Sequence, residues 1–159
     1  MAIPYHLFAP RLLLAASLSA VLGAEREYHQ KPAGLRTNIL IGTGSALFTM
    51  LSLAFAHETG GSADRIAAQI VTGIGFLGAG AILHGGQSTR VHGLTTAATI
   101  WVNAAIGMAV GAGAQAAAVA TTGLTLVVLV LLPPIETFFE RRAHRRGIYP
   151  PGERDVDRP

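Results

Sequence analysis

The stretch Gln69–Leu83, QIVTGIGFLGAGAIL, decides how the rest of this sequence is interpreted. It is apolar throughout, but it is rich in glycine and alanine rather than in leucine. In a helix in water each glycine costs about 1 kcal/mol relative to alanine. In a lipid bilayer, small residues instead allow two helices to approach closely and pack. The stretch therefore predicts a membrane helix, and we expect it to be the central helix of a small bundle.

Helical spacing arranges the residues of this stretch in two adjacent stripes. One stripe consists of Ala68, Thr72, Gly75 and Ala79, and the other of Gln69, Gly73, Phe76 and Gly80. Two stripes predict neighbouring helices on two sides. The residues that we expect to pack against other helices are Ala68, Thr72, Gly73, Gly75, Gly78, Ala79, Gly80 and, on a later helix, Gly107.

The composition favours a membrane protein over a soluble or disordered one. Of the 159 residues, 50% are hydrophobic and 13% are charged, and the mean hydropathy is +0.44. The absence of cysteine excludes a disulfide framework, a thiolate nucleophile and a cysteine metal site. The basic residues lie between or after the apolar runs rather than in one patch, so we do not expect a nucleic-acid partner. We expect no cofactor either.

Five apolar runs are each long enough to cross the hydrocarbon core, which takes about 20 residues. They cover about 7–24, 35–56, 66–83, 93–112 and 114–132. The predicted fold class is therefore an all-α bundle of five transmembrane helices occupying residues 1–134. For the first run, the alternative is a secretory signal peptide with Arg11 in its basic region. The transmembrane reading places Arg11 at the outer interface instead.

Pro133 and Pro134 are expected to end the fifth helix. Residues 135–159 then form a basic cytoplasmic tail. Its first part, with Phe138 and Phe139 beside several arginines, suits a short helix on an anionic membrane surface, and its last part is expected to be disordered. The alternative for this tail is an anchor with no further role.

The distribution of basic residues predicts the orientation. If the C-terminus is cytoplasmic, only Arg11 and Arg65 of the 12 arginines and lysines lie outside. Cytoplasmic segments of membrane proteins carry the excess of these residues. We therefore predict that the chain crosses the membrane several times, with its N-terminus outside and its C-terminus in the cytoplasm.

Three blocks of the sequence resemble the MgtC/SapB family of bacterial inner-membrane proteins. The blocks are AEREYHQKPAGLRT (24–37), DRIAAQIVTGIGFLGAGAIL (64–83) and VHGLTTAATIWVNAAIGMAVGAG (91–113). They occur in order and at the expected spacing, and the resemblance covers roughly residues 10–132. It implies a five-helix membrane protein with a cytoplasmic C-terminus.

The resemblance also implies a class of function. Some family members are associated with growth at low magnesium and with survival inside host cells. The best-studied type acts as a regulator that affects ATP synthase and membrane energetics. Those members carry a soluble C-terminal domain, which we expect this short form to lack.

Charged residues at the predicted inner ends of the helices are the first candidates for function. Glu25, Arg26, Arg36 and Arg90 are expected to gather at the cytoplasmic mouth, with Glu25 paired to Arg36 or Arg90. The alternative is ordinary interfacial anchoring. The resemblance includes the ERE and AGLRT residues, and it favours a functional role for Glu25, Arg26 and Arg36. We expect His29 to be a solvated loop residue.

At the predicted outer end, Asp64 and Arg65 precede the third apolar run, and Gln69 lies about one turn further in. Asp64 is expected to cap this helix, because an acidic side chain suits the positive end of the helix dipole. It is also a weak candidate for a cation site. A dedicated magnesium cage is not expected, because no predicted span has a carboxylate at its centre.

The fourth run carries the remaining candidates. Thr95 and Thr96 are expected to cap its helix, and Asn103 shares a face with Thr96, Thr99, Gly107 and Gly111. Trp101 fits contact with lipid or packing between helices, and packing in the core is the favoured alternative. No Ser-His-Asp or paired-carboxylate arrangement is found, so we do not expect an enzyme.

Three functions fit these observations. The first is a membrane regulator that binds another membrane protein through its small-residue faces. The second is a magnesium or other cation transporter with Asp64 on its path, and the third is a structural homo-oligomer. Under the first two hypotheses, Gly75→Leu or Ala79→Leu is expected to break helix packing. The expected partners are the lipid bilayer, a membrane protein or a second copy, and a weakly bound cation.

Overall fold

The computed structural model describes residues 5–62, 64–83 and 93–145 of the chain. A short 3-10 helix, Tyr5–Leu7, leads into the first of five long helices, and the described residues form no strand, so the predicted all-α class is confirmed. The long helices are α1 (Phe8–Tyr28), α2 (Leu35–Thr59), α3 (Asp64–Leu83), α4 (Leu94–Ala112) and α5 (Gln115–Arg145).

Four of these helices are long and apolar enough to cross a bilayer. They are α1, α2, α4 and, within α5, the part Gln115–Ile135. The apolar part of α3 is shorter and covers Ala67–Ile82. The fold is thus that of a multi-pass membrane protein. A fifth crossing by α3, and with it the outside N-terminus and inside C-terminus, stays a prediction.

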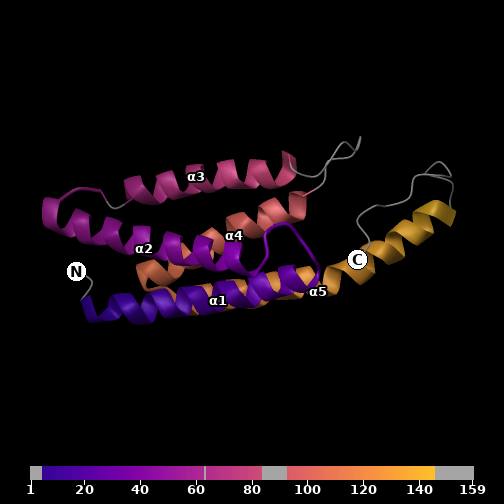
Figure 1. Cartoon of the computed structure of the whole chain (residues 1–159), viewed down its shortest axis with the longest axis horizontal. Coiled ribbons are helices and arrows are strands. Elements are labelled where there is room, and N and C mark those ends of the chain that lie inside the picture. Colours follow the sequence, from indigo (N-terminus) through magenta and orange to yellow (C-terminus); the bar gives the residue numbers. More distant parts are fainter. Residues whose placement is uncertain (1–4, 63, 84–92, 146–159) are drawn as a thin grey trace.

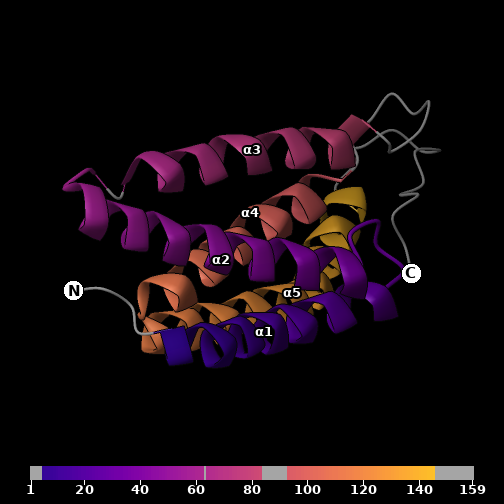
Figure 2. The ribbon, with the colours of Figure 1, turned by 60° about the vertical axis from the view of Figure 1, so that its left-hand side comes forward.

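The helices form three layers (Figures 1 and 2). The first layer is α3 alone, the middle layer consists of α2 and α4, and the third layer consists of α1 and α5. Among the described residues α4 contacts all four of the other long helices, whereas α3 contacts only α4 and α2. The prediction that α3 is the central helix is therefore wrong, because α4 takes that place.

The helix α3 is not central because it buries only one side, the side that carries Ile70, Ile74 and Gly78. Ile70 and Ile74 are each 8% exposed, and a Cβ on Gly78 would make ordinary contact with Ala97 of α4. The predicted small-residue stripes lie on the other sides of the helix. Ala68, Gln69, Thr72, Gly73, Gly75, Phe76 and Ala79 are exposed, and a Cβ on Gly73, Gly75 or Gly80 would meet nothing within 4 Å. Among the described residues, these stripes do not pack against other helices.

Close helix packing occurs instead where α1, α2 and α4 cross. A Cβ on Gly107 of α4 would overlap the carbonyl oxygen of Gly42 on α2, and a Cβ on Gly42 would overlap the Ser19 hydroxyl of α1. Gly111 lies in the same way against Ala46 of α2. These glycines bring three backbones together, as small residues do in membrane bundles. The closest backbone approaches are therefore among α1, α2 and α4, whereas α3 packs against the bundle through Ile70 and Ile74.

Arg11 joins the outer layer to the end of the central helix. Its Nη1 donates a hydrogen bond of 2.7 Å to the carbonyl oxygen of Gly111, in the last turn of α4. The last carbonyls of a helix lack partners within the helix and carry partial negative charge. The arginine thus satisfies one of them and ties α1 to α4.

We expect Arg11→Gln to lower the free energy of unfolding by about 1 kcal/mol, because glutamine is shorter and carries no charge for the helix end. Unfolding in mixed micelles, followed by the fluorescence of Trp101, would measure the loss. Arg36→Gln is the matched control, since Arg36 is exposed. An equal loss in both variants would contradict the capping role.

The fifth helix departs from its predicted end. It continues through Pro133 and Pro134 to Arg145, so the prediction that these prolines end it is wrong. Proline fixes φ near −65°, which is a helical value, and its cost is a lost hydrogen bond and a clash that bends the helix. Figures 1 and 2 show the gold, C-terminal part of α5 leaving the direction of the orange part. The division of the chain at residue 134 and the disorder of the tail stay predictions.

Candidate functional site

The largest group of interacting polar side chains lies where α1 turns into α2. The turn begins with Gln30, whose φ of 51° is left-handed. The amide of Lys31 donates to the carbonyl oxygen of Arg26, and the amide of Gln30 donates to that of Glu27. This pair of bonds is the Schellman arrangement that ends many helices. It holds the last charged turn of α1 against the start of α2.

Glu25 and Arg26 form a buried ion pair in this last turn. Arg26 Nε and Nη2 donate to the two carboxylate oxygens of Glu25 over 2.5 and 2.8 Å. The side chains of Arg26 and Glu25 are only 5% and 8% exposed. His29 Nδ1 lies 3.1 Å from Glu25 Oε1, and the His29 side chain is 37% exposed. A bidentate pair of this kind fixes both side chains in one geometry.

These contacts correct the predicted pairing. Glu25 contacts Arg26 and His29, whereas Arg36 is exposed, so its predicted pairing with Glu25 is wrong. Arg90 lies outside the described residues. His29 was expected to be solvated, but its ring lies beside Glu25. The spacing of four residues between Glu25 and His29 could have indicated this contact, because α1 extends to Tyr28 rather than ending near residue 24.

Glu27 is a residue that the sequence reasoning missed. Its Oε2 accepts a 3.0 Å hydrogen bond from the amide of Leu35, the first residue of α2. The residue before Leu35 is Gly34, which has no side chain to cap the helix. The carboxylate of Glu27 therefore takes the place of a capping residue and suits the positive end of α2. The sequence signal that could have indicated this role is Gly34, because a helix that begins after glycine needs a cap from another residue.

Below the turn, two asparagines connect α2 to α4. Asn38 Nδ2 donates to the carbonyl oxygens of Ala33 and Gly34 over 2.6 and 2.9 Å. Asn103 Nδ2 donates to the carbonyl oxygen of Asn38 over 2.7 Å. Both asparagines are completely buried. These bonds orient each amide group, because only its nitrogen can donate to a carbonyl.

This orientation leaves acceptors without partners. Asn38 Oδ1, Asn103 Oδ1 and the hydroxyls of Ser19 and Thr43 are buried and have no hydrogen-bond partner among the described residues. Other buried hydroxyls, those of Thr49, Thr99 and Thr122, donate to the carbonyl four residues earlier in their own helix. The four unsatisfied oxygens belong to α1, α2 and α4, and they mark the region where these helices meet as the polar centre of the bundle.

The remaining candidates do not come together at one place. At the opposite end, α3 begins at Asp64, whose side chain lies outside what the structure describes, while Arg65 and Gln69 are exposed. The capping and cation roles of Asp64 stay predictions. Within the described side chains, no three histidines, aspartates or glutamates lie close enough together to hold a metal ion.

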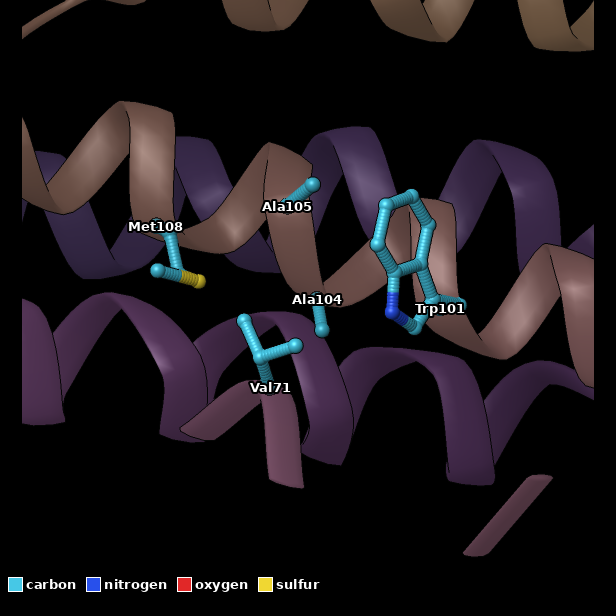
Figure 3. A pocket seen from close by; sticks show the side chains of 5 residues that line it. All are labelled: Val71, Trp101, Ala104, Ala105 and Met108. Carbon is cyan, nitrogen blue, oxygen red and sulfur yellow. The ribbon is translucent and has the colours of Figure 1, made fainter. Parts of the chain in front are cut away.

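The candidates on α4 need two corrections. The residue that caps α4 is Gly93, with φ of 85° and no side-chain bond, whereas Thr95 and Thr96 lie inside the helix. Thr96 is buried and Thr95 is exposed. Trp101 is 54% exposed rather than in the core. It lines an open apolar groove of about 230 Å³ beside α3 (Figure 3), together with Val71, Ala104, Ala105 and Met108.

Comparisons with known proteins place the chain in a family. A family model described as MgtC family matches residues 12–138. "Protein MgtC" of Salmonella typhimurium (strain LT2) is 48% identical over 129 residues, which cover 81% of this chain and 52% of the relative. "Putative magnesium transporter YhiD" of Escherichia coli (strain K12) is 49% identical over 129 residues, covering 77% of this chain and 59% of that relative.

A third relative is similar over a comparable length. "Uncharacterized protein slr0014" of Synechocystis is 45% identical over 132 residues, covering 83% of this chain and 55% of the relative. The chain thus spans little more than half the length of the curated relatives it matches. No solved structure matches it significantly. On the family model and on these identities, the chain belongs to the MgtC family.

Proposed function

We propose that this chain is a non-enzymatic regulator in the bacterial inner membrane. It acts by binding another membrane protein through the exposed side of α3 that carries Gly73 and Gly75. The observation that carries this proposal is the position of the small residues. Gly73 and Gly75 are exposed and have empty space where a side chain would be. Lipid-facing helices gain nothing from such gaps, whereas a second helix fills them and gains van der Waals contact.

The rest of α3 supports the same assignment. Its inner side packs through Ile70 and Ile74, so a partner on the outer side would not displace the chain's own helices. By contrast, the exposed part of α5 carries large apolar residues such as Leu124, Val127 and Leu131, which is typical of a helix that faces lipid. A link to magnesium limitation or membrane energetics comes from the family resemblance and from the name of the YhiD relative.

A cation transporter is the second candidate, and one observation favours it. The unsatisfied oxygens of Asn38, Asn103 and Ser19 could accept from a hydrated ion at the centre of the bundle. Against it, the described polar residues of the interior are neutral except for the paired Arg26. Magnesium usually binds through one or two carboxylates. The buried threonine hydroxyls that donate within their own helices also support a structural role for this polar centre.

A matched pair of glycine variants tests the regulator. Gly75 on α3 and Gly123 on α5 are both exposed, and a Cβ at either would meet nothing within 4 Å. We expect Gly75→Leu to abolish complementation of a deletion strain at limiting magnesium, because leucine fills the groove that the partner helix needs. Gly123→Leu should complement fully, and both variants should reach wild-type levels in the membrane.

Two outcomes would contradict the regulator. One is full complementation by Gly75→Leu. The other is magnesium flux into proteoliposomes of the purified chain above that of empty vesicles, which would make it a transporter. A benzophenone cross-linker on Gly75→Cys identifies the partner directly, because the chain has no other cysteine. A cross-linked product of two copies of this chain would assign the face to self-association.

A further inference from the structure

The length of α5 and the prolines within it mark the end of this helix as a separate surface. It has 31 residues, which at about 1.5 Å per residue span roughly 46 Å. The hydrocarbon core of a bilayer is only about 30 Å thick, and the apolar span ends at Ile135. The segment 136–145 therefore continues as helix beyond the hydrocarbon core.

Among the described residues, no other helix covers the two exposed aromatic residues of this segment. Phe138 and Phe139 are 59% and 63% exposed, and their rings pack edge to face on each other at 5.9 Å. The described residues of α5 contact only α4 and α1. Figure 1 shows the gold segment projecting past the end of α1. Two exposed phenylalanines in water are unfavourable, so another surface is needed to cover them.

The sequence of the segment indicates which surface that is. By helical spacing, Ile135, Phe138, Phe139 and Ala143 share one side, and Arg145 occupies a position at its edge, next to that of Phe138. Glu140 and Arg141 occupy positions on the other side. Arg142 is exposed at the side of the phenylalanines. A helix with aromatic residues on one face and arginines around it is suited to lie in the headgroup region.

We propose that residues 136–145 of α5 form an interfacial helix that binds the anionic headgroups of the membrane next to the end of its own span. Pro133 and Pro134 make this geometry available, because the bend directs the segment away from the axis of the bundle. The phenylalanines enter the acyl boundary and the arginines contact the lipid phosphates. The bilayer is the occupant because the last residue of the span, Ile135, already lies at its surface.

Single-cysteine labelling of the full chain tests this assignment, since the sequence contains no cysteine. Phe138→Cys and Glu140→Cys carry an environment-sensitive fluorophore on opposite sides of the helix. The protein is reconstituted in vesicles of phosphatidylcholine with or without phosphatidylglycerol. With phosphatidylglycerol, we expect the label at position 138 to shift to the blue and to resist quenching by iodide. The label at position 140 should stay accessible.

The electrostatic part has its own variant. Each basic residue near an anionic surface contributes about 1 kcal/mol, which is about a fivefold effect. Arg141→Gln with Arg142→Gln should therefore lower the ratio of bound to free helix roughly 30-fold. High salt should also lower the ratio of bound to free helix, because at 1 M the screening length shortens to about 3 Å.

Two results would overturn the proposal. The first is equal quenching at positions 138 and 140 in vesicles that contain phosphatidylglycerol. The second is shielding of position 138 that does not depend on phosphatidylglycerol. If that shielding decreases when the protein is diluted in lipid, a second copy of the chain covers the phenylalanines instead.

Discussion

Gly107→Ala is expected to lower the free energy of unfolding by about 2–3 kcal/mol, the upper part of the range for overpacking a core. The added methyl group would overlap the carbonyl oxygen of Gly42 and approach two further backbone atoms of that residue to 3.0 Å. A backbone cannot change rotamer to make room, so α2 and α4 must move apart. One turn away, Asn103 then loses its 2.7 Å bond to the carbonyl of Asn38.

Unfolding in mixed micelles, with Trp101 as the probe, would measure this loss. Gly75→Ala is the matched control, because the added methyl group meets nothing within 4 Å and alanine has the higher helix propensity. It should be neutral or slightly stabilising. Similar losses in the two variants would contradict the prediction that the close α2–α4 crossing causes the loss in Gly107→Ala.

Glu25→Gln is expected to cost about 3–5 kcal/mol, the range for removing one partner of a buried ion pair. The Arg26 side chain is only 5% exposed. In the variant its guanidinium stays buried but has lost the carboxylate that neutralises it. The cost is that of an uncompensated charge, and it is larger than the contribution of the intact pair. Glu25→Gln combined with Arg26→Met removes both charges and should recover much of the lost stability.

The double-mutant cycle is the measurement that checks this prediction, because it isolates the coupling between the two side chains. Glu58→Gln, at an exposed position near the end of α2, controls for the general effect of removing a carboxylate. If the double variant is as unstable as the sum of the single variants, the pair does not act as a buried ion pair.

The two predictions concern the same part of the molecule for a physical reason. Glu25 and Arg26 follow Gly23 of α1, which packs against Leu35 and Asn38 of α2. The carbonyl of Asn38 accepts the bond from Asn103, one turn from Gly107 of α4. In lipid, polar groups without partners are costly. The closeness of the helices and the satisfaction of their polar groups therefore depend on each other. Loosening one contact between these helices should weaken the neighbouring hydrogen bonds as well.

The sequence alone determined the helices themselves. Apolar runs of sufficient length must form helices in a bilayer, because only a helix satisfies its backbone groups within one segment. The predicted runs at 35–56 and 93–112 accordingly correspond to Leu35–Thr59 and Leu94–Ala112. The three matching blocks of sequence also indicated the family, which a family model and close relatives confirm.

The tertiary structure decided which sides of these helices are used. A stripe of small residues can face a helix of the same chain or remain open for another, and the pattern of Gly73 and Gly75 is the same in both cases. Likewise, the sequence offered Arg36 and Arg90 as partners of Glu25. Its pairing with Arg26 and His29 depends on α1 continuing to Tyr28, because only then do these side chains share one helical turn. Such choices depend on the distances between helices, and those distances are properties of the packed bundle rather than of any one segment.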